Sequence, residues 1–255
     1  MTKNPDHAAG AVVGIREVYP SLAGRLHAHE RAQLVYAVEG VITVTTSRGH
    51  FVVPSRRAVF VPALERHKVE SKRPFRLTTL YFDVARVDGL PAAPAVVEVS
   101  PLLRELVLAL VDAPWGGYPA GGRTDRLVSA LLAELDVAGA APLSLPLPTD
   151  PRARRVAAAL VANPADASTL TRLAHLAKAS PRHLERVFVA ETGLTLGAYR
   201  QQVRLLAALD RLAAGASVLE TALDLGYQSA SSFGVMFKRA LGVSPARYYP
   251  RASRR

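Results

Sequence analysis

Apolar residues over positions 1–90 occur in short runs that are rich in β-branched and aromatic side chains. The runs are GRLHAHE, AQLVYAV, VITVTT, HFVVP, RAVFVP, HKVES and FRLTTLYF, and Gly, Pro or charged residues separate them. Many short strands at regular spacing are typical of a β-sandwich or a β-barrel. We therefore predict an all-β domain over residues 1–90, which ends where GLPAAPA interrupts the pattern.

The spacing of apolar positions becomes helical over residues 91–139. One helix is predicted over 100–112, where a Ser-Pro pair supplies the cap and the first helical residue. A second helix is predicted over 123–138, where leucines recur on one face. These helices could complete the first domain, or they could pair with a second copy of the chain and make a homodimer. Residues 140–149 are rich in proline and poor in charge, which predicts an interdomain linker.

Residues 150–255 are predicted to form an all-helical domain, because helix caps and glycine stops agree with the apolar periodicity. The predicted helix starts are Asp150-Pro151, Ser168, Ser180-Pro181, Ser217, about Ser229, and Ser244-Pro245. The predicted ends are Asn163, Gly193, Gly215, Gly226 and Gly242. Ser217 and Glu220 have the spacing of a capping box, in which each side chain bonds the backbone N–H of the other.

Two helix pairs in this domain repeat one pattern. In the first pair the small or apolar positions are Ala174, Ala177, Leu184 and Phe188, and in the second they are Ala222, Leu225, Phe233 and Phe237. The offset is 48 residues before the turn and 49 after it, so the second turn holds one extra residue. A small residue on one helix against a large one on the next is typical of helix-turn-helix units. We predict two such units, at about 168–191 and 217–241, joined by a long helix.

The charge distribution separates the two halves of the chain. Of the net charge of +11, residues 150–255 carry +9, from sixteen Lys or Arg against seven Asp or Glu. A basic half beside a nearly neutral half indicates that one domain binds a polyanion. A connecting helix of roughly twenty residues spans about 30 Å, close to the ~34 Å between successive major-groove faces of double-stranded DNA. Two units could therefore contact one side of a DNA duplex.

The segments AKASPRHLERVFVAETGLTLGAYRQQVRLLAALDRL and ALDLGYQSASSFGVMFKRALGVSPARYY carry a family resemblance. Over residues 150–250 the chain resembles the DNA-binding domain of the AraC/XylS family of bacterial transcription regulators. Thr195-Leu196 departs from the family pattern, where Ser-Pro is usual, and this affects only a helix start. The resemblance implies an activator or a repressor that binds a DNA operator and, if it is an activator, contacts the transcription machinery.

Candidate DNA contacts differ between the two recognition helices. Arg182, Glu185 and Arg186 have the spacing of one outer face, and the resemblance places the base-contacting positions on these three. Arginine can bind guanine O6 and N7 together, and glutamate can accept from cytosine N4. His183 is expected at a phosphate or on the plain surface, and Val187 is expected to face inward with Leu184 and Phe188.

The second recognition helix offers Ser231 and Ser232 as short-range base contacts, and its outward face has no long polar side chain. Lys238 and Arg239 are expected to hold phosphates. We therefore expect most sequence specificity to come from the first unit.

The N-terminal domain contains a candidate ligand site at His27, His29, Gln33 and His67. Residues at i and i+2 of a strand face the same side, so His27 and His29 could point together into a barrel. Residues 12–85 resemble the cupin family in the order of these residues, but Gln33 stands where that family prefers glutamate. The site could hold a divalent metal, it could bind an anionic or polar effector without metal, or the histidines could be structural. The chain has no cysteine, which excludes cysteine-ligated metals.

These observations predict an α+β protein of two domains: a cupin-like β-barrel followed by helices, then an all-α domain with two helix-turn-helix units. A transcription regulator controlled by a small molecule or metal fits best, with no catalytic residue. The alternative is a cupin metalloenzyme, such as a dioxygenase or isomerase, with an attached nucleic-acid-binding domain; a nonspecific nucleoid protein is a third class. The paired helix-turn-helix units favour the regulator.

The N-terminal residues lack the order of a signal peptide, and no apolar run could span a membrane, so we expect a cytoplasmic protein.

Overall fold

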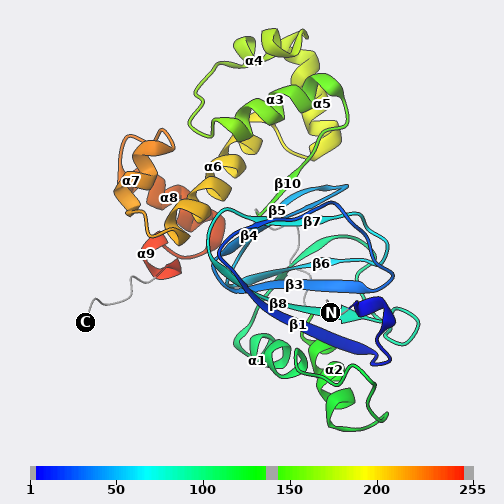
Figure 1. Ribbon diagram of the computed structural model, residues 1–255. Helices are drawn as coiled ribbons and strands as arrows, with labels where there is room; N and C mark the ends of the chain where they lie inside the picture. The colour runs from blue at the N-terminus through cyan, green and yellow to red at the C-terminus, as the bar shows by residue number, and fades with distance from the viewer. Residues whose placement is uncertain (1–3, 136–142, 250–255) are drawn as a thin grey trace. The chain divides into compact units, whose positions relative to one another are not determined.

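A computed structural model describes residues 4–135 and 143–249 (Figure 1). The chain divides into two compact units, residues 1–141 and 142–255. A sheet-rich N-terminal unit precedes a helical C-terminal unit, which confirms the predicted α+β class. The second helix, expected to reach residue 138, ends earlier, at Ala133, with Glu134 as its C-cap. The predicted start of the linker at 140 lies outside the described residues.

Two antiparallel sheets form the N-terminal unit. The first has the strand order β1-β8-β3-β6-β9, and the second runs β5-β4-β7-β2 within this unit. The strands are β1 (Val12–Tyr19), β2 (Leu22–Ala23), β3 (Ala32–Glu39), β4 (Val41–Thr46), β5 (Gly49–Pro54), β6 (Arg57–Val61), β7 (Lys68–Ser71), β8 (Phe75–Phe82) and β9 (Ala95–Glu98). A short 3₁₀ turn, Pro5–His7, precedes them.

Three parts of the strand prediction need correction. The segment GRLHAHE is not a regular strand, because within it only His27 makes an isolated bridge, to His67. Strand β1 was not predicted, yet it pairs along its whole length with β8. Strand β9 lies inside the range expected to be helical, and its four residues pair with β6. Each outcome depends on a partner strand distant in sequence, which local propensity does not reveal.

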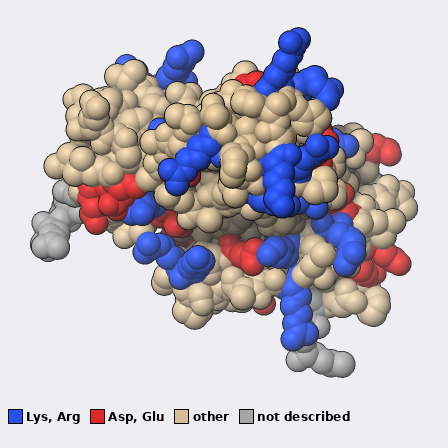
Figure 2. Space-filling view, turned by 90° about the horizontal axis from the view of Figure 1, so that it is seen from above, with Lys and Arg blue, Asp and Glu red and all other residues tan. Residues whose placement is uncertain are grey.

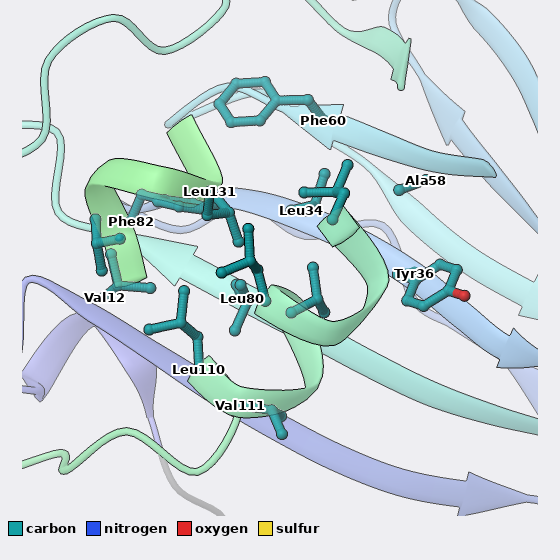
Figure 3. Close-up of a cluster of buried hydrophobic side chains, with 14 of the residues drawn as sticks. Val12, Leu34, Tyr36, Ala58, Phe60, Leu80, Phe82, Leu110, Val111 and Leu131 are labelled. Carbon is teal, nitrogen blue, oxygen red and sulfur yellow. The ribbon is translucent and has the colours of Figure 1, made fainter. Parts of the chain in front are cut away.

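Two helices cover one face of the first sheet, α1 (Pro101–Leu110) and α2 (Arg123–Ala133). Figure 3 shows Leu110, Val111 and Leu131 from this helical layer against side chains of the sheet, all within one buried cluster. The helical layer also touches the sheet backbone at Gly14, where an added Cβ would lie 2.4 Å from the Cα of Val111. The two helices therefore complete the first domain and bury their apolar faces within it.

The C-terminal unit is helical apart from a short strand, β10 (Ser144–Pro146), which lies in the predicted linker. Its helices are α3 (Pro151–Ala162), α4 (Leu170–Ala177), α5 (Pro181–Thr192), α6 (Leu196–Ala213), α7 (Val218–Asp224), α8 (Ala230–Leu241) and α9 (Pro245–Tyr248). The capping box of Ser217 and Glu220 is confirmed. Helix α4 begins one residue later than expected, because Thr169 and not Ser168 caps it. None of the helices in the described part of the chain combines the length and the hydropathy that a membrane-spanning helix needs.

Candidate DNA-binding surface and histidine cluster

The two helix-turn-helix units have separate cores that use the repeated positions. All eight of the predicted small or apolar residues are buried: Ala174, Ala177, Leu184, Phe188, Ala222, Leu225, Phe233 and Phe237. In the first unit the ring of Phe188 packs edge-on to Tyr199 of α6, with ring centroids 5.2 Å apart. In the second unit the rings of Phe233 and Phe237 lie 5.7 Å apart. Each recognition helix is therefore held by its own aromatic contacts.

In each helix-turn-helix unit, one residue of the turn between the two helices has a left-handed backbone conformation. Lys178 has φ of +52° and Gly226 has φ of +80°, and these two residues are 48 positions apart. Glycine enters this left-handed region without steric cost, whereas lysine does so at some cost. A Cβ at Gly226 would lie 3.3 Å from the carbonyl oxygen of Ala165, so a larger residue there would also crowd the neighbouring backbone.

Helix α5 presents a charged outer face. Arg182 and Arg186 are exposed, while Glu185 between them is half-buried. One carboxylate oxygen of Glu185 accepts the backbone N–H of Leu196 at 3.3 Å, at the start of α6. Arg186 donates to Nδ1 of His183 at 3.3 Å, which holds its guanidinium against the same helix. Val187 is half-buried, so its expected inward position is only partly met.

Helix α8 presents a different surface. Ser231 is exposed, and the hydroxyl of Ser232 donates to the backbone carbonyl of Ser229 at 2.9 Å. The apolar side chain of Val235 is 71% exposed at the centre of this face. Lys238 and Arg239 are exposed in the last turn. Figure 2 shows Lys and Arg side chains projecting at several places on one face of the molecule, with Asp, Glu and uncharged residues among them.

The three candidate histidines of the N-terminal unit lie together. His27 and His67 exchange backbone hydrogen bonds of 2.9 Å in both directions, and the N–H of Leu64 donates to the carbonyl of His29 at 2.9 Å. One ring nitrogen from each histidine lies within 4.8 Å of the others. Leu64 has φ of +63°, a strained conformation for a leucine, so the loop before His67 bends back onto the segment that holds His29.

Each ring is oriented by the backbone and by Gln33. The Nδ1 atoms of His27 and His67 face the carbonyl oxygens two residues before them, each at 2.9 Å, and Nδ1 of His29 faces the carbonyl of Arg31. Oε1 of Gln33 lies 3.2 Å from Nε2 of His29 and 2.9 Å from Nε2 of His67. The four residues predicted from sequence therefore converge on one point.

Two residues of this site were not predicted from sequence. The amide nitrogen of Gln33 donates to the hydroxyls of Thr79 at 2.8 Å and Tyr81 at 3.1 Å. Both residues lie on β8, which pairs with β3 so that Gln33 stands opposite Tyr81. The run FRLTTLYF contains polar residues within an apolar strand, but only the pairing of β3 with β8 shows what they contact.

Burial differs across the cluster. His27 is exposed, whereas His29 and His67 are buried at 9% and 0% exposure. Burial lowers the pKa of His67 to about 4, so its ring is neutral at physiological pH. The site therefore has a buried side, where His67 is neutral, and a side at the protein surface, where His27 lies.

Families of known proteins match both parts of the chain that hold these two sites. Residues 9–139 match the family described as an AraC-like ligand binding domain, and residues 173–251 match a helix-turn-helix domain family. The chain is 32% identical over 245 residues to the HTH-type transcriptional regulator NimR of Escherichia coli, covering 96% of this chain and 89% of NimR. The chain belongs to the AraC family of transcription regulators.

Further similarities are more local or more distant. The regulator RipA of Corynebacterium diphtheriae is 36% identical over 102 residues, which cover 40% of this chain and 30% of RipA. A crystal structure of ToxT from Vibrio cholerae aligns over 97% of this chain and 98% of its own, with 8% identity and a TM-score of 0.40.

Membership of the AraC family decides between the function classes drawn from the sequence. The chain is a transcription regulator with a DNA-binding unit and a ligand-binding unit, and its relatives are regulators. Nothing in these similarities supports the cupin metalloenzyme that was the alternative.

Proposed function

We propose that this AraC-family regulator recognises its double-stranded DNA operator chiefly through α5, and that α8 adds affinity and register. The contrast between the two outer faces carries the proposal. Helix α5 exposes Arg182 and Arg186 one turn apart, whereas α8 exposes serine hydroxyls and the apolar side chain of Val235. Bidentate arginine contacts to guanine discriminate among bases more strongly than single hydroxyls do.

The residues of α5 take distinct roles in this proposal. The side chain of Arg182 makes no hydrogen bond or ion pair within residues 4–135 and 143–249, so its guanidinium is free to bind a guanine edge. Arg186 also contacts a base, and His183 supports its guanidinium. For His183 to contact a phosphate as well, its ring must turn outward, because its Nε2 atom is buried. Glu185 keeps one carboxylate oxygen for a cytosine amino group, since the other is engaged by Leu196.

The residues of α8 supply weaker or sequence-independent contacts. Ser231 and Ser232 contact bases at short range, and the Ser232 hydroxyl is already engaged by Ser229. Lys238 and Arg239 bind phosphates, which fix the position of the helix and carry no sequence information.

Affinity selection of random DNA duplexes tests this proposal, with the full-length protein at a fixed salt concentration. We expect the wild-type protein to select one motif. Arg182→Ala should weaken binding to that motif by about 1–3 kcal/mol, roughly 5- to 150-fold, and relax preference at one position. Arg48→Ala is the matched control, because it removes the same charge from an exposed turn of the N-terminal unit.

The outcomes separate the candidate mechanisms. Binding without a motif, with a steep salt dependence, would contradict sequence-specific recognition and indicate a nonspecific basic domain. If base changes in the α8 half of the motif proved as costly as those in the α5 half, the proposed division between the two helices would be wrong.

We also propose that a small-molecule effector binds the N-terminal unit and that the protein acts as a homodimer. The effector shifts the balance between two states only by its difference in affinity for them.

Because α1 and α2 bury their apolar faces against their own sheet, a dimer through this layer would use their outer sides, where Leu102 is 54% exposed. Sedimentation velocity of the full chain measures the oligomeric state. An activator would also contact the transcription machinery.

A further inference from the structure

We infer that His27, His29, His67 and Gln33 form a binding site for one divalent transition-metal ion. This inference rests on the proposed ligand-sensing function of the N-terminal unit and names a ligand for it. Three ring nitrogens lie within 4.8 Å of one another, and Oε1 of Gln33 lies 2.9 Å from one of these rings and 3.2 Å from another. Four donor atoms from three segments of the chain thus face one point.

The positions of the ring protons support this inference. Each Nδ1 faces a backbone carbonyl oxygen, which can only accept a hydrogen bond, so each Nδ1 carries the proton. A neutral imidazole has one proton, so each Nε2 presents a lone pair. Metal-binding histidines commonly donate their other ring N–H to a carbonyl in this way.

The orientation of the Gln33 amide completes the donor set. The Thr79 hydroxyl donates to the carbonyl of Leu34 at 3.0 Å, so it accepts the proton from Nε2 of Gln33. This contact turns Oε1 of Gln33 toward His29 and His67, where two ring lone pairs already point. Facing acceptors repel one another unless a cation lies between them, and a metal ion supplies that charge.

Without a metal ion, the opposite orientation of the Gln33 side-chain amide would suit the histidine rings better. With the Gln33 amide turned by half a revolution, its NH₂ group would donate to both rings and satisfy them. Its oxygen would then accept from the hydroxyl of Tyr81, but it would also face Oγ1 of Thr79, whose hydrogen is already donated to Leu34. The hydroxyl of Thr79 therefore favours the orientation that suits a cation.

The donor types indicate the class of ion. Three imidazoles and one amide oxygen suit Zn²⁺, Co²⁺, Ni²⁺ or Fe²⁺, whereas Mg²⁺ and Ca²⁺ prefer sites made of oxygen. Zinc–nitrogen bonds of about 2.0–2.1 Å place neighbouring nitrogens roughly 3.4 Å apart in a tetrahedral site. Small rotations of the three rings bring their nitrogens to that spacing, because they begin within 4.8 Å.

Metal titration of the tag-free, full-length protein tests the inference. Protein treated with a chelator is dialysed against Zn²⁺ or Co²⁺, its metal content is measured by mass spectrometry, and affinity is measured by competition with a coloured chelator. We expect one equivalent of Zn²⁺ or Co²⁺ and no binding of Mg²⁺. Co²⁺ should also give a visible ligand-field spectrum typical of nitrogen coordination.

Three variants at the site and one control variant assign the metal ligands. His27→Gln and His67→Gln should each weaken metal binding by about 100-fold or more, since loss of outer partners alone costs 10- to 100-fold. His50→Gln is the matched control, because His50 lies in the same unit and its Nδ1 bonds Thr45, away from the cluster. Gln33→Glu adds a negative charge to the donor set and should strengthen binding by about tenfold or more.

The inference is overturned if the wild-type protein binds no metal, or if His27→Gln and His67→Gln bind it as the wild type does. The gain in Gln33→Glu guards against misfolding, because a misfolded protein would not bind metal more tightly. DNA selection on the same preparation separates the two ideas: a motif selected by metal-free protein that binds no Zn²⁺ would overturn the metal site and leave the regulator intact.

Discussion

The aromatic core of the second helix-turn-helix unit allows the two units to be tested separately. Phe237 of α8 is fully buried, and its ring centroid lies 5.7 Å from that of Phe233 and 5.7 Å from that of Tyr248. Phe237→Ala removes the middle ring of this row. The core of the first unit, where Phe188 meets Tyr199, has no ring contact with this row among the described residues.

The size of the effect follows from this burial. Replacing a buried phenylalanine by alanine costs about 3–5 kcal/mol through lost burial and the cavity that remains. A whole domain is usually stable by only 5–15 kcal/mol, so the second unit should open locally far more often. At about 1.4 kcal/mol for each factor of ten, amide protection limited by this opening should fall by roughly 140- to 3,700-fold.

Hydrogen exchange of the full-length protein, followed by mass spectrometry, measures this effect. Protection should fall over α7 to α9 and persist over α4 and α5. In DNA selection, Phe237→Ala should bind more weakly and keep the part of the motif that α5 contacts. Val235→Ala is the control on the same helix, because this side chain is 71% exposed and its loss should change stability by less than about 0.5 kcal/mol.

Equal loss of protection in both units would refute the idea of two separate cores. Loss of the whole DNA motif in a variant whose first unit stays protected would instead refute the assignment of specificity to α5.

Two further predictions test charged groups, one in the C-terminal unit and one in the N-terminal unit. Lys238→Ala should weaken binding to all DNA sequences alike and reduce the slope of log affinity against log salt by about 1, which titration at several salt concentrations measures. His50→Gln should reduce the acid sensitivity of the N-terminal unit. Burial, aided by Lys68, lowers the pKa of His50 below its usual 6.5, so the unfolded chain takes up this proton first as pH falls. The wild type should therefore lose stability as pH falls through about 6.5 toward the lowered pKa, and chemical denaturation at several pH values should show a smaller loss in the variant. An unchanged salt slope in Lys238→Ala would count against the phosphate contact. An unchanged loss of stability with falling pH in His50→Gln would count against the role of His50.

The helical unit could be predicted closely from the sequence because its determinants are local. Ser180, Thr195 and Ser217 each cap the helix that follows, and each accepts a backbone N–H within three residues. The repeat placed Phe188 and Phe237 in equivalent cores, since positions one helical turn apart share a face. The engagement of Glu185 with Leu196 was not predicted, because it depends on how α5 meets α6.

The N-terminal unit was predicted less completely because its contacts join distant residues. Strand β9 looks like part of a proline-rich connection, and it becomes a strand only through β6. The segment GRLHAHE alternates as a strand does, but within it the only β-bridge among the described residues is the isolated one at His27. Thr79 and Tyr81 reach Gln33 only because β8 lies beside β3, across a separation of more than forty residues.

Residue order alone predicts the two-part organisation, the paired helix-turn-helix units with their cores, and the four residues that meet in the N-terminal unit. Periodicity, helix caps and residue types are properties of neighbouring residues, so they can be recognised without knowing which distant segment they contact. The orientation of each histidine ring, the contacts of Thr79 and Tyr81 with Gln33, and the burial of α1 and α2 against the sheet are set only in the folded protein. Those features arise from pairing and packing between segments far apart in the chain, where each side chain depends on a neighbour that local sequence does not name.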